Sequence, residues 1–138
     1  MTDTQPWMEW LMNTLREAAW APLAVFLFYL LGLTLELYER FPPLDIPTHF
    51  LGGMAITYFY RAAIRHAQAL VGEIPFPIQI LFAFTSTGTT AVFWEFYEFI
   101  IDFFLNAEMM LGVTNTIVDF FMGLSGALVV SLFYRKHR

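Results

Sequence analysis

Cysteine is absent from the sequence, and charged residues are scarce. Without cysteine the chain can form neither disulfides nor thiolate metal sites, and its redox compartment cannot be read from cysteine usage. Asp, Glu, Lys and Arg together make up 14% of the 138 residues, against about 25% in an ordinary soluble domain. A chain this short cannot bury its 58% of hydrophobic residues in a core of its own. The composition therefore predicts one integral membrane domain.

Basic residues are too few for a nucleic-acid-binding surface. The chain has 7 Lys and Arg against 12 Asp and Glu, which gives a formal net charge of -5. Since no basic stripe is present to neutralise phosphates, nucleic acid is excluded as a partner. The first residues, MTDTQPW, lack the basic region of a signal peptide, so we expect the first apolar segment to remain in the mature protein.

Four apolar segments follow a short amphipathic one. Residues 6–19 have helical spacing, and Trp7 and Trp10 suit the headgroup region, so we expect either an interfacial helix or a helix packed on the bundle. The apolar segments cover residues 20–37, 46–63, 78–105 and 113–134, with short links that favour antiparallel neighbours. The sequence predicts an all-α fold: an N-terminal interfacial amphipathic helix (1–19) and a four-helix transmembrane bundle (20–138) that contacts the lipid bilayer.

Two local features refine this bundle. As a helix, the segment 78–105 would be roughly 40 Å long, more than the hydrocarbon core, so it must tilt, protrude or break. Its middle reads TSTGTT, at residues 85–90, which indicates either an irregular point or close helix packing. At the start of the second segment, Asp45 is positioned as an N-cap and Pro47 lies in the opening turn.

Basic residues predict the orientation. With four spans, both termini and the middle link lie on the same side of the membrane. That side carries Arg16, Arg61, Arg65, Arg135, Lys136 and Arg138, whereas the other side carries Arg40. By the positive-inside rule we expect a multi-pass protein of the inner (plasma) membrane with both termini in the cytoplasm.

Ionisable residues gather at the outer end of the predicted bundle. Helical rise brings acids from several segments to one level, and Glu95, Glu98 and Asp102 share a helix face at i, i+3 and i+7. The candidate site residues are His49, Glu95, Glu98, Asp119, Asp45 and Asp102. Small residues accompany them, with Gly53 on the second segment and Gly123 and Gly126 on the fourth, which is typical of packed helix faces.

Carboxylates inside a bilayer are costly, and three arrangements would relieve their mutual repulsion: bound protons, a bound cation or a water-filled vestibule. Carboxylate and imidazole ligands together suit zinc, manganese or iron, so a divalent metal ion is the cofactor we expect. Simpler structural roles stay open for three of the residues: Asp45 as an N-cap, His49 as a hydrogen-bonded core histidine, and Asp102 as a solvated residue near a helix end. Glu95 and Glu98 lie among aromatic residues, so at least one must face the protein interior.

Three short motifs of the chain resemble the YjdF-like family of bacterial inner-membrane proteins and, more distantly, the VanZ-like proteins. Residues 45–53, DIPTHFLGG, look like the family's D-x-x-x-H-F-x-x-G element, and residues 95–98, EFYE, look like its E-x-x-E helix. Residues 115–119, NTIVD, look like its D-T-x-x-D element, with Asn115 in place of an aspartate. The resemblance covers residues 45–127, with fewer spans than typical members. It implies a shared fold and site without supplying a reaction.

Three functions are compatible with these observations. The first is a divalent-cation-binding site at the extracytoplasmic end of the bundle, and the second is a metal-dependent enzyme acting on lipid-linked substrates. The third is an accessory subunit of a larger respiratory, photosynthetic or transport assembly, or a homo-oligomer. A complete proton pathway is disfavoured, because acids do not recur through the inner halves of the segments. No residue is assigned a catalytic role.

Overall fold

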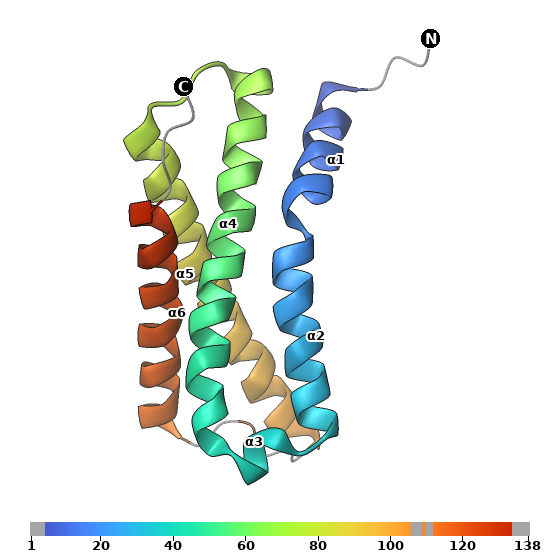
Figure 1. Cartoon of the computed structure of the whole chain (residues 1–138), viewed down its shortest axis with the longest axis vertical. Coiled ribbons are helices and arrows are strands. Elements are labelled where there is room, and N and C mark those ends of the chain that lie inside the picture. Colours follow the sequence, from blue (N-terminus) through green and yellow to red (C-terminus); the bar gives the residue numbers. More distant parts are fainter. Residues whose placement is uncertain (1–4, 106–108, 110–111, 134–138) are drawn as a thin grey trace.

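The computed structural model of the chain describes residues 5–105, 109 and 112–133, and all regular structure within them is helical. The elements are α1 (Pro6–Ala18), α2 (Trp20–Thr34), α3 (Leu37–Arg40), the 3-10 helix η1 (Pro42–Leu44), α4 (Asp45–Val71), α5 (Phe76–Leu105) and α6 (Val113–Phe133). α1 and α2 follow one another along one side of the bundle, and α5 crosses behind α4 at an angle (Figure 1). The all-α prediction is confirmed.

The central helix is α4, which packs against α1, α2, α5 and α6 and most extensively against α6. A stripe of glycines allows this contact. A Cβ atom on Gly53 would lie 1.9 Å from the carbonyl oxygen of Gly123, and one on Gly126 would lie 2.1 Å from that of Phe50. Only glycine permits backbones to approach so closely, so the predicted small-residue packing is confirmed.

Hydroxyl groups join α4 to α5. The Oγ1 atoms of Thr57 and Thr87 are 2.8 Å apart and buried, and the hydroxyl of Tyr60 lies 2.9 Å from Oγ1 of Thr90. Residues 85–90 form regular helix within the uninterrupted α5, so the alternative of an irregular point there is wrong. The alternative of close packing is confirmed, because this segment makes the contacts with α4.

Helix α1 is attached to α4 by polar contacts. Nε1 of Trp10 donates to the carbonyl oxygen of Ala63 at 2.8 Å, and the Glu17 carboxylate accepts from Nε2 of His66 at 2.8 Å and from the Arg65 guanidinium. The axes of α1 and α2 differ by 55° across the break at residue 19. These contacts agree with a helix packed on the bundle, whose outer face still exposes large apolar side chains: Trp7, Met8, Leu11, Met12 and Leu15.

Among the described helices, α5 and α6 are long and apolar enough to cross a membrane, and the bent α1–α2 pair adds a third span if it acts as one. Helix α2 alone has 15 residues, fewer than the roughly 20 that a span requires. Helix α4 has 27 residues and is long enough for a span, but its sequence is less apolar than those of α5 and α6 and does not qualify by composition. Length and composition therefore support two or three of the four predicted spans.

Two predicted helix ends differ from the observed ones. The first apolar helix ends at Thr34 rather than at residue 37, because Glu36 adopts a left-handed conformation (φ 55°) that interrupts the helix before α3. Helix α4 continues to Val71, eight residues beyond the expected end, and stops where Gly72 adopts φ 87°.

The structure describes only some of the basic residues that predict the orientation. Arg61 is 1% exposed, and its guanidinium lies 5.1 Å from the centroid of the Phe76 ring, so it is a buried residue rather than a surface charge. The basic residues at positions 135, 136 and 138 lie outside the described residues.

Candidate metal centre

His49 lies among acidic side chains of α4, α5 and α6. It belongs to two groups of potential metal ligands: Asp45, His49 and Asp119 form one, and His49, Glu95 and Glu98 form the other. Within each group, one ligand atom from each residue lies within 4.8 Å of the others. The structure therefore brings five of the six predicted site residues into one cluster around a single imidazole.

In the first group, Nε2 of His49 is 3.3 Å from Oδ1 of Asp45 and 3.8 Å from Oδ1 of Asp119. The side-chain amide of Asn115 donates to Oδ2 of Asp119 at 2.6 Å and to Oδ2 of Asp45 at 3.4 Å. One amide thus holds the second oxygen of both carboxylates, and the first oxygen of each lies on the His49 side. An aspartate at position 115 could not donate these bonds.

The prediction that Asp45 caps α4 is wrong. Leu44 occupies the N-cap position, and α4 has no side-chain capping hydrogen bond. Asp45 is the first residue of the helix, and its carboxylate interacts with His49 and Asn115 instead. The tertiary contacts of Asp45 thus replace the capping interaction that its local sequence favours, and they make Asp45 part of the cluster.

Asp119 has the least satisfied carboxylate of the cluster. The residue is 2% exposed, and its Oδ1 atom is buried with no hydrogen-bond donor among the described residues, while the Asp45 carboxylate lies within hydrogen-bonding reach of the Asp119 side chain. The 3.8 Å to His49 is too long for a hydrogen bond. A buried carboxylate oxygen without a donor is costly, so this atom needs a proton, a cation or a water molecule.

Glu95 and Glu98 both face the protein interior. Their exposures are 5% and 6%, so the prediction that at least one points inward is confirmed. Nε1 of Trp94 donates to Oε1 of Glu98 at 2.9 Å, and the Thr116 side chain of α6 hydrogen-bonds Glu95. The outer face of the same helix turns carries exposed aromatic residues, namely Phe93, Phe96 and Phe99.

Asp102 lies outside both ligand groups. It is half-buried, and its Oδ1 accepts a hydrogen bond from the backbone N–H of Met109 at 2.6 Å. This bond joins the last turn of α5 to the chain that follows. Asp102 is therefore the predicted site residue that the structure does not bring to His49.

The glycine contacts determine the spacing of the cluster. Gly53 lies one helical turn after His49 on α4, and Gly123 lies one turn after Asp119 on α6. The closest approach of the two backbones is thus one turn from the pair of side chains. Because the glycines hold the helices together at this level, His49 and Asp119 face each other across the interface.

Sequence reasoning missed two residues that orient the cluster. In the sequence Asn115 stands out as a departure from a family motif and shares a helix face with Asp119, but no orienting role is assigned to it, and Trp94 is only one of several aromatic residues. Both precede a carboxylate by four residues, Asp119 and Glu98 respectively, and side chains with this spacing meet on a helix surface. The i, i+4 spacing was therefore the available signal.

Comparison with known proteins places the chain in a family. A family model described as "Predicted membrane protein (DUF2238)" matches residues 7–138, nearly the whole chain. The chain belongs to this family. DUF2238 membership supports the membrane assignment, and the YjdF-like resemblance is consistent with it, whereas the VanZ-like resemblance stays a prediction.

One relative of this DUF2238 chain comes from Thermotoga maritima and is described as an uncharacterized protein. The two sequences are 30% identical over 115 residues, which cover 82% of this chain. The matched region is 59% of that protein's length, so the chain corresponds to only part of its relative. No solved structure matches the chain.

Proposed function

We propose that this DUF2238 chain binds one divalent cation through His49 and the carboxylates around it. The observation that carries the proposal is the buried Oδ1 of Asp119, which has no hydrogen-bond donor among the described residues and lies on the His49 side of its carboxylate. A cation next to this oxygen would supply the missing interaction, and four other potential ligands lie in the same cluster.

The surroundings of the cluster support a metal site over a chance gathering of acids. Metal ligands in proteins are generally held in place by hydrogen bonds from a second layer of residues. Here Asn115 holds the far oxygens of Asp45 and Asp119, and Trp94 holds one oxygen of Glu98. The mixed imidazole and carboxylate ligands suit zinc, manganese or iron.

We also propose that α4, α5, α6 and the bent α1–α2 pair form a transmembrane bundle of four spans, with α1 in the interfacial region and α2 completing the span inside the membrane domain. The polar residues of α4 do not argue against a span, because Thr48, Thr57 and Arg61 are buried in the protein and away from lipid. By the positive-inside rule, the remaining bias of basic residues supports an inner-membrane protein with both termini in the cytoplasm. The cation site then lies at the extracytoplasmic end.

Elemental analysis of the purified chain tests the cation site. The variants are Asp119→Asn and Glu98→Gln, which remove one potential ligand charge from each group. Asp102→Asn is the matched control, because it removes an α5 carboxylate that lies outside both groups. We expect stoichiometric metal in the wild type and in the control, and a loss of metal in the two site variants.

A wild-type chain that carries no metal, and takes up none when zinc, manganese and iron are offered, would contradict the proposal. Equal metal content in Asp119→Asn and Asp102→Asn would contradict the assignment of the ligands. Unfolding of the wild type in chelator gives a second measurement, since a ligand that binds the folded state stabilises it.

A further inference from the structure

An apolar cavity of about 530 Å³ lies between the α1–α2 pair and helices α4 and α5. This volume falls within the range of about 300–1,000 Å³ that small-molecule sites occupy. The lining extends from Leu15 and Ala19 at the α1–α2 junction to Tyr29 on α2, and from Ile56 to Thr48 on α4. The α4 part alone covers about 12 Å of helix axis, so the cavity is elongated along the bundle.

Polar groups of the cavity wall are concentrated at one end. His49 lines that end, so the cavity reaches the candidate metal centre. Thr87 and Thr90 line the wall farther along α5, but their hydroxyls already bond Thr57 and Tyr60 and carbonyl oxygens of their own helix. An ordered water needs two to four polar partners, which this part of the wall does not offer. The cavity is therefore suited to hydrocarbon rather than water.

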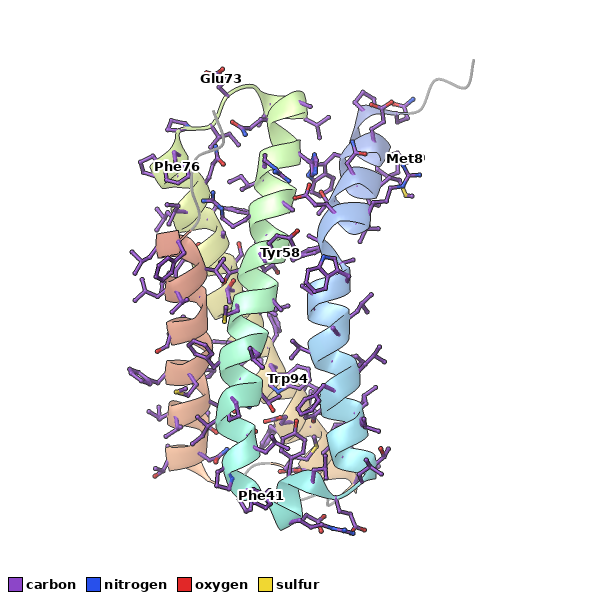
Figure 2. The ribbon with its side chains drawn as sticks, viewed as in Figure 1. Met8, Phe41, Tyr58, Glu73, Phe76 and Trp94 are labelled. Atoms are coloured by element: carbon purple, nitrogen blue, oxygen red, sulfur yellow. The ribbon has the colours of Figure 1, made fainter. Side chains whose placement is uncertain are left out.

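Trp94 joins the cavity to the metal centre. Its ring lines the cavity and meets the Tyr29 ring edge to face, with centroids 4.8 Å apart, while its indole N–H holds Glu98. Figure 2 shows this side chain in the space between α2 and α4. The hydroxyl of Tyr29 is buried and has no hydrogen-bond partner among the described residues. The Tyr29 hydroxyl at this end of the cavity is thus available to hydrogen-bond a ligand.

We propose that the cavity holds a hydrocarbon chain of a phosphate-bearing membrane lipid, whose phosphate reaches the cation at His49. The head-group assignment rests on the proposed function, because carboxylates without a cation would repel an anionic head group. Bound zinc, manganese and iron act as Lewis acids toward phosphoryl oxygens. The elongated apolar wall accounts for the chain, and the cation accounts for the charge of the head group.

Photo-crosslinking tests the chain-binding part. The full chain is reconstituted in phosphatidylcholine vesicles that contain phosphatidic acid with a diazirine near the end of one acyl chain, and labelled residues are mapped by mass spectrometry. We expect label on cavity residues such as Val25, Ile56 and Ala91. In Gly52→Leu this label should be lost, because a Cβ at Gly52 meets only Val25, at 3.9 Å, and the longer side chain can enter the cavity. Thr89→Leu adds a leucine on the exposed side of α5 and should leave the label unchanged.

Unlabelled cavity residues in the wild type, or undiminished label in Gly52→Leu, would overturn the proposal. Ala91→Leu fills the cavity from the opposite wall and replaces Gly52→Leu if that variant does not fold. A diacylglycerol probe with the same chain tests the head group: it should label the cavity more weakly, and EDTA should reduce the label from phosphatidic acid. Equal labelling by both probes, with and without EDTA, would refute the head-group assignment. Metal content measured on the same samples reports separately on the proposed function.

Discussion

Replacing Gly53 by alanine should push α4 and α6 apart. The new Cβ would lie 1.9 Å from the carbonyl oxygen of Gly123 and 2.7 Å and 2.9 Å from its carbonyl carbon and Cα. All three are backbone atoms, so no side-chain rotation relieves the contact. The helices must separate by roughly 1.5 Å before the oxygen contact becomes an ordinary one, and the neighbouring side chains then lose dispersion contacts.

The magnitude follows from two opposing effects. Overpacking of a well-packed interface costs about 1–3 kcal/mol, and backbone contacts belong at the upper end. Alanine gains up to about 1 kcal/mol over glycine in a helix. We therefore expect Gly53→Ala to lower the free energy of unfolding by about 2 kcal/mol. Gly52→Ala is the matched control, because its Cβ has one neighbour at 3.9 Å and should be neutral or stabilising by up to about 1 kcal/mol.

Reversible unfolding in mixed detergent and SDS micelles, followed by tryptophan fluorescence, measures both variants. Metal affinity provides a second measurement, since the same separation moves His49 away from Asp119, one turn from the contact. Equal stability of Gly53→Ala and Gly52→Ala would refute the close backbone contact between α4 and α6. The spacing of His49 and Asp119 could then no longer be attributed to the glycines.

Three further substitutions test separate contacts. Asn115→Leu removes the amide that orients the carboxylates of Asp45 and Asp119. It should weaken metal binding by about 10- to 100-fold in titration calorimetry, and unchanged affinity would count against the orienting role. Thr57→Val should lower the free energy of unfolding by about 1 kcal/mol, because the bond to Thr87 is lost. The hydroxyl of Thr89 bonds its own helix, so Thr89→Val should lower it clearly less, and equal losses would contradict the α4–α5 bond. Glu17→Gln should weaken the ion pair that attaches α1 to Arg65 by up to about 1 kcal/mol. Amide hydrogen exchange in α1 should then become faster relative to α6, and unchanged exchange in α1 would argue against this attachment.

The long helices were predictable because hydrophobicity sets them. Segments 78–105 and 113–134 begin within two residues of α5 and α6, and the glycine stripe on α6 correctly predicted a packed face. The break after Thr34 was not predictable. It depends on the left-handed conformation of Glu36, and a sequence usually marks such a position with glycine rather than glutamate.

The cluster was predictable in membership and not in detail. Periodicity on each helix selects the faces that carry His49, Glu98 and Asp119, so their meeting follows once the helices pack. The contact of Asp45 with Asn115 depends on how α4 and α6 are rotated, which no local pattern encodes. The cavity was missed for the same reason, since it is formed only when the α1–α2 pair packs beside α4 and α5.

The central position of α4 also bears on how the protein is made. Synthesis proceeds from the N-terminus, so Asp45 and His49 of α4 emerge before Glu95 and Glu98, and Asp119 emerges last. Until α6 arrives, the polar groups of α4 lack the partners that the finished bundle provides, at a depth where unpaired charges are expensive. In the proposed four-span topology, the half-made chain therefore carries these polar groups without their α6 partners until the last helix is added. Addition of α6 is then the step that brings Asp119 to His49 and completes the cluster.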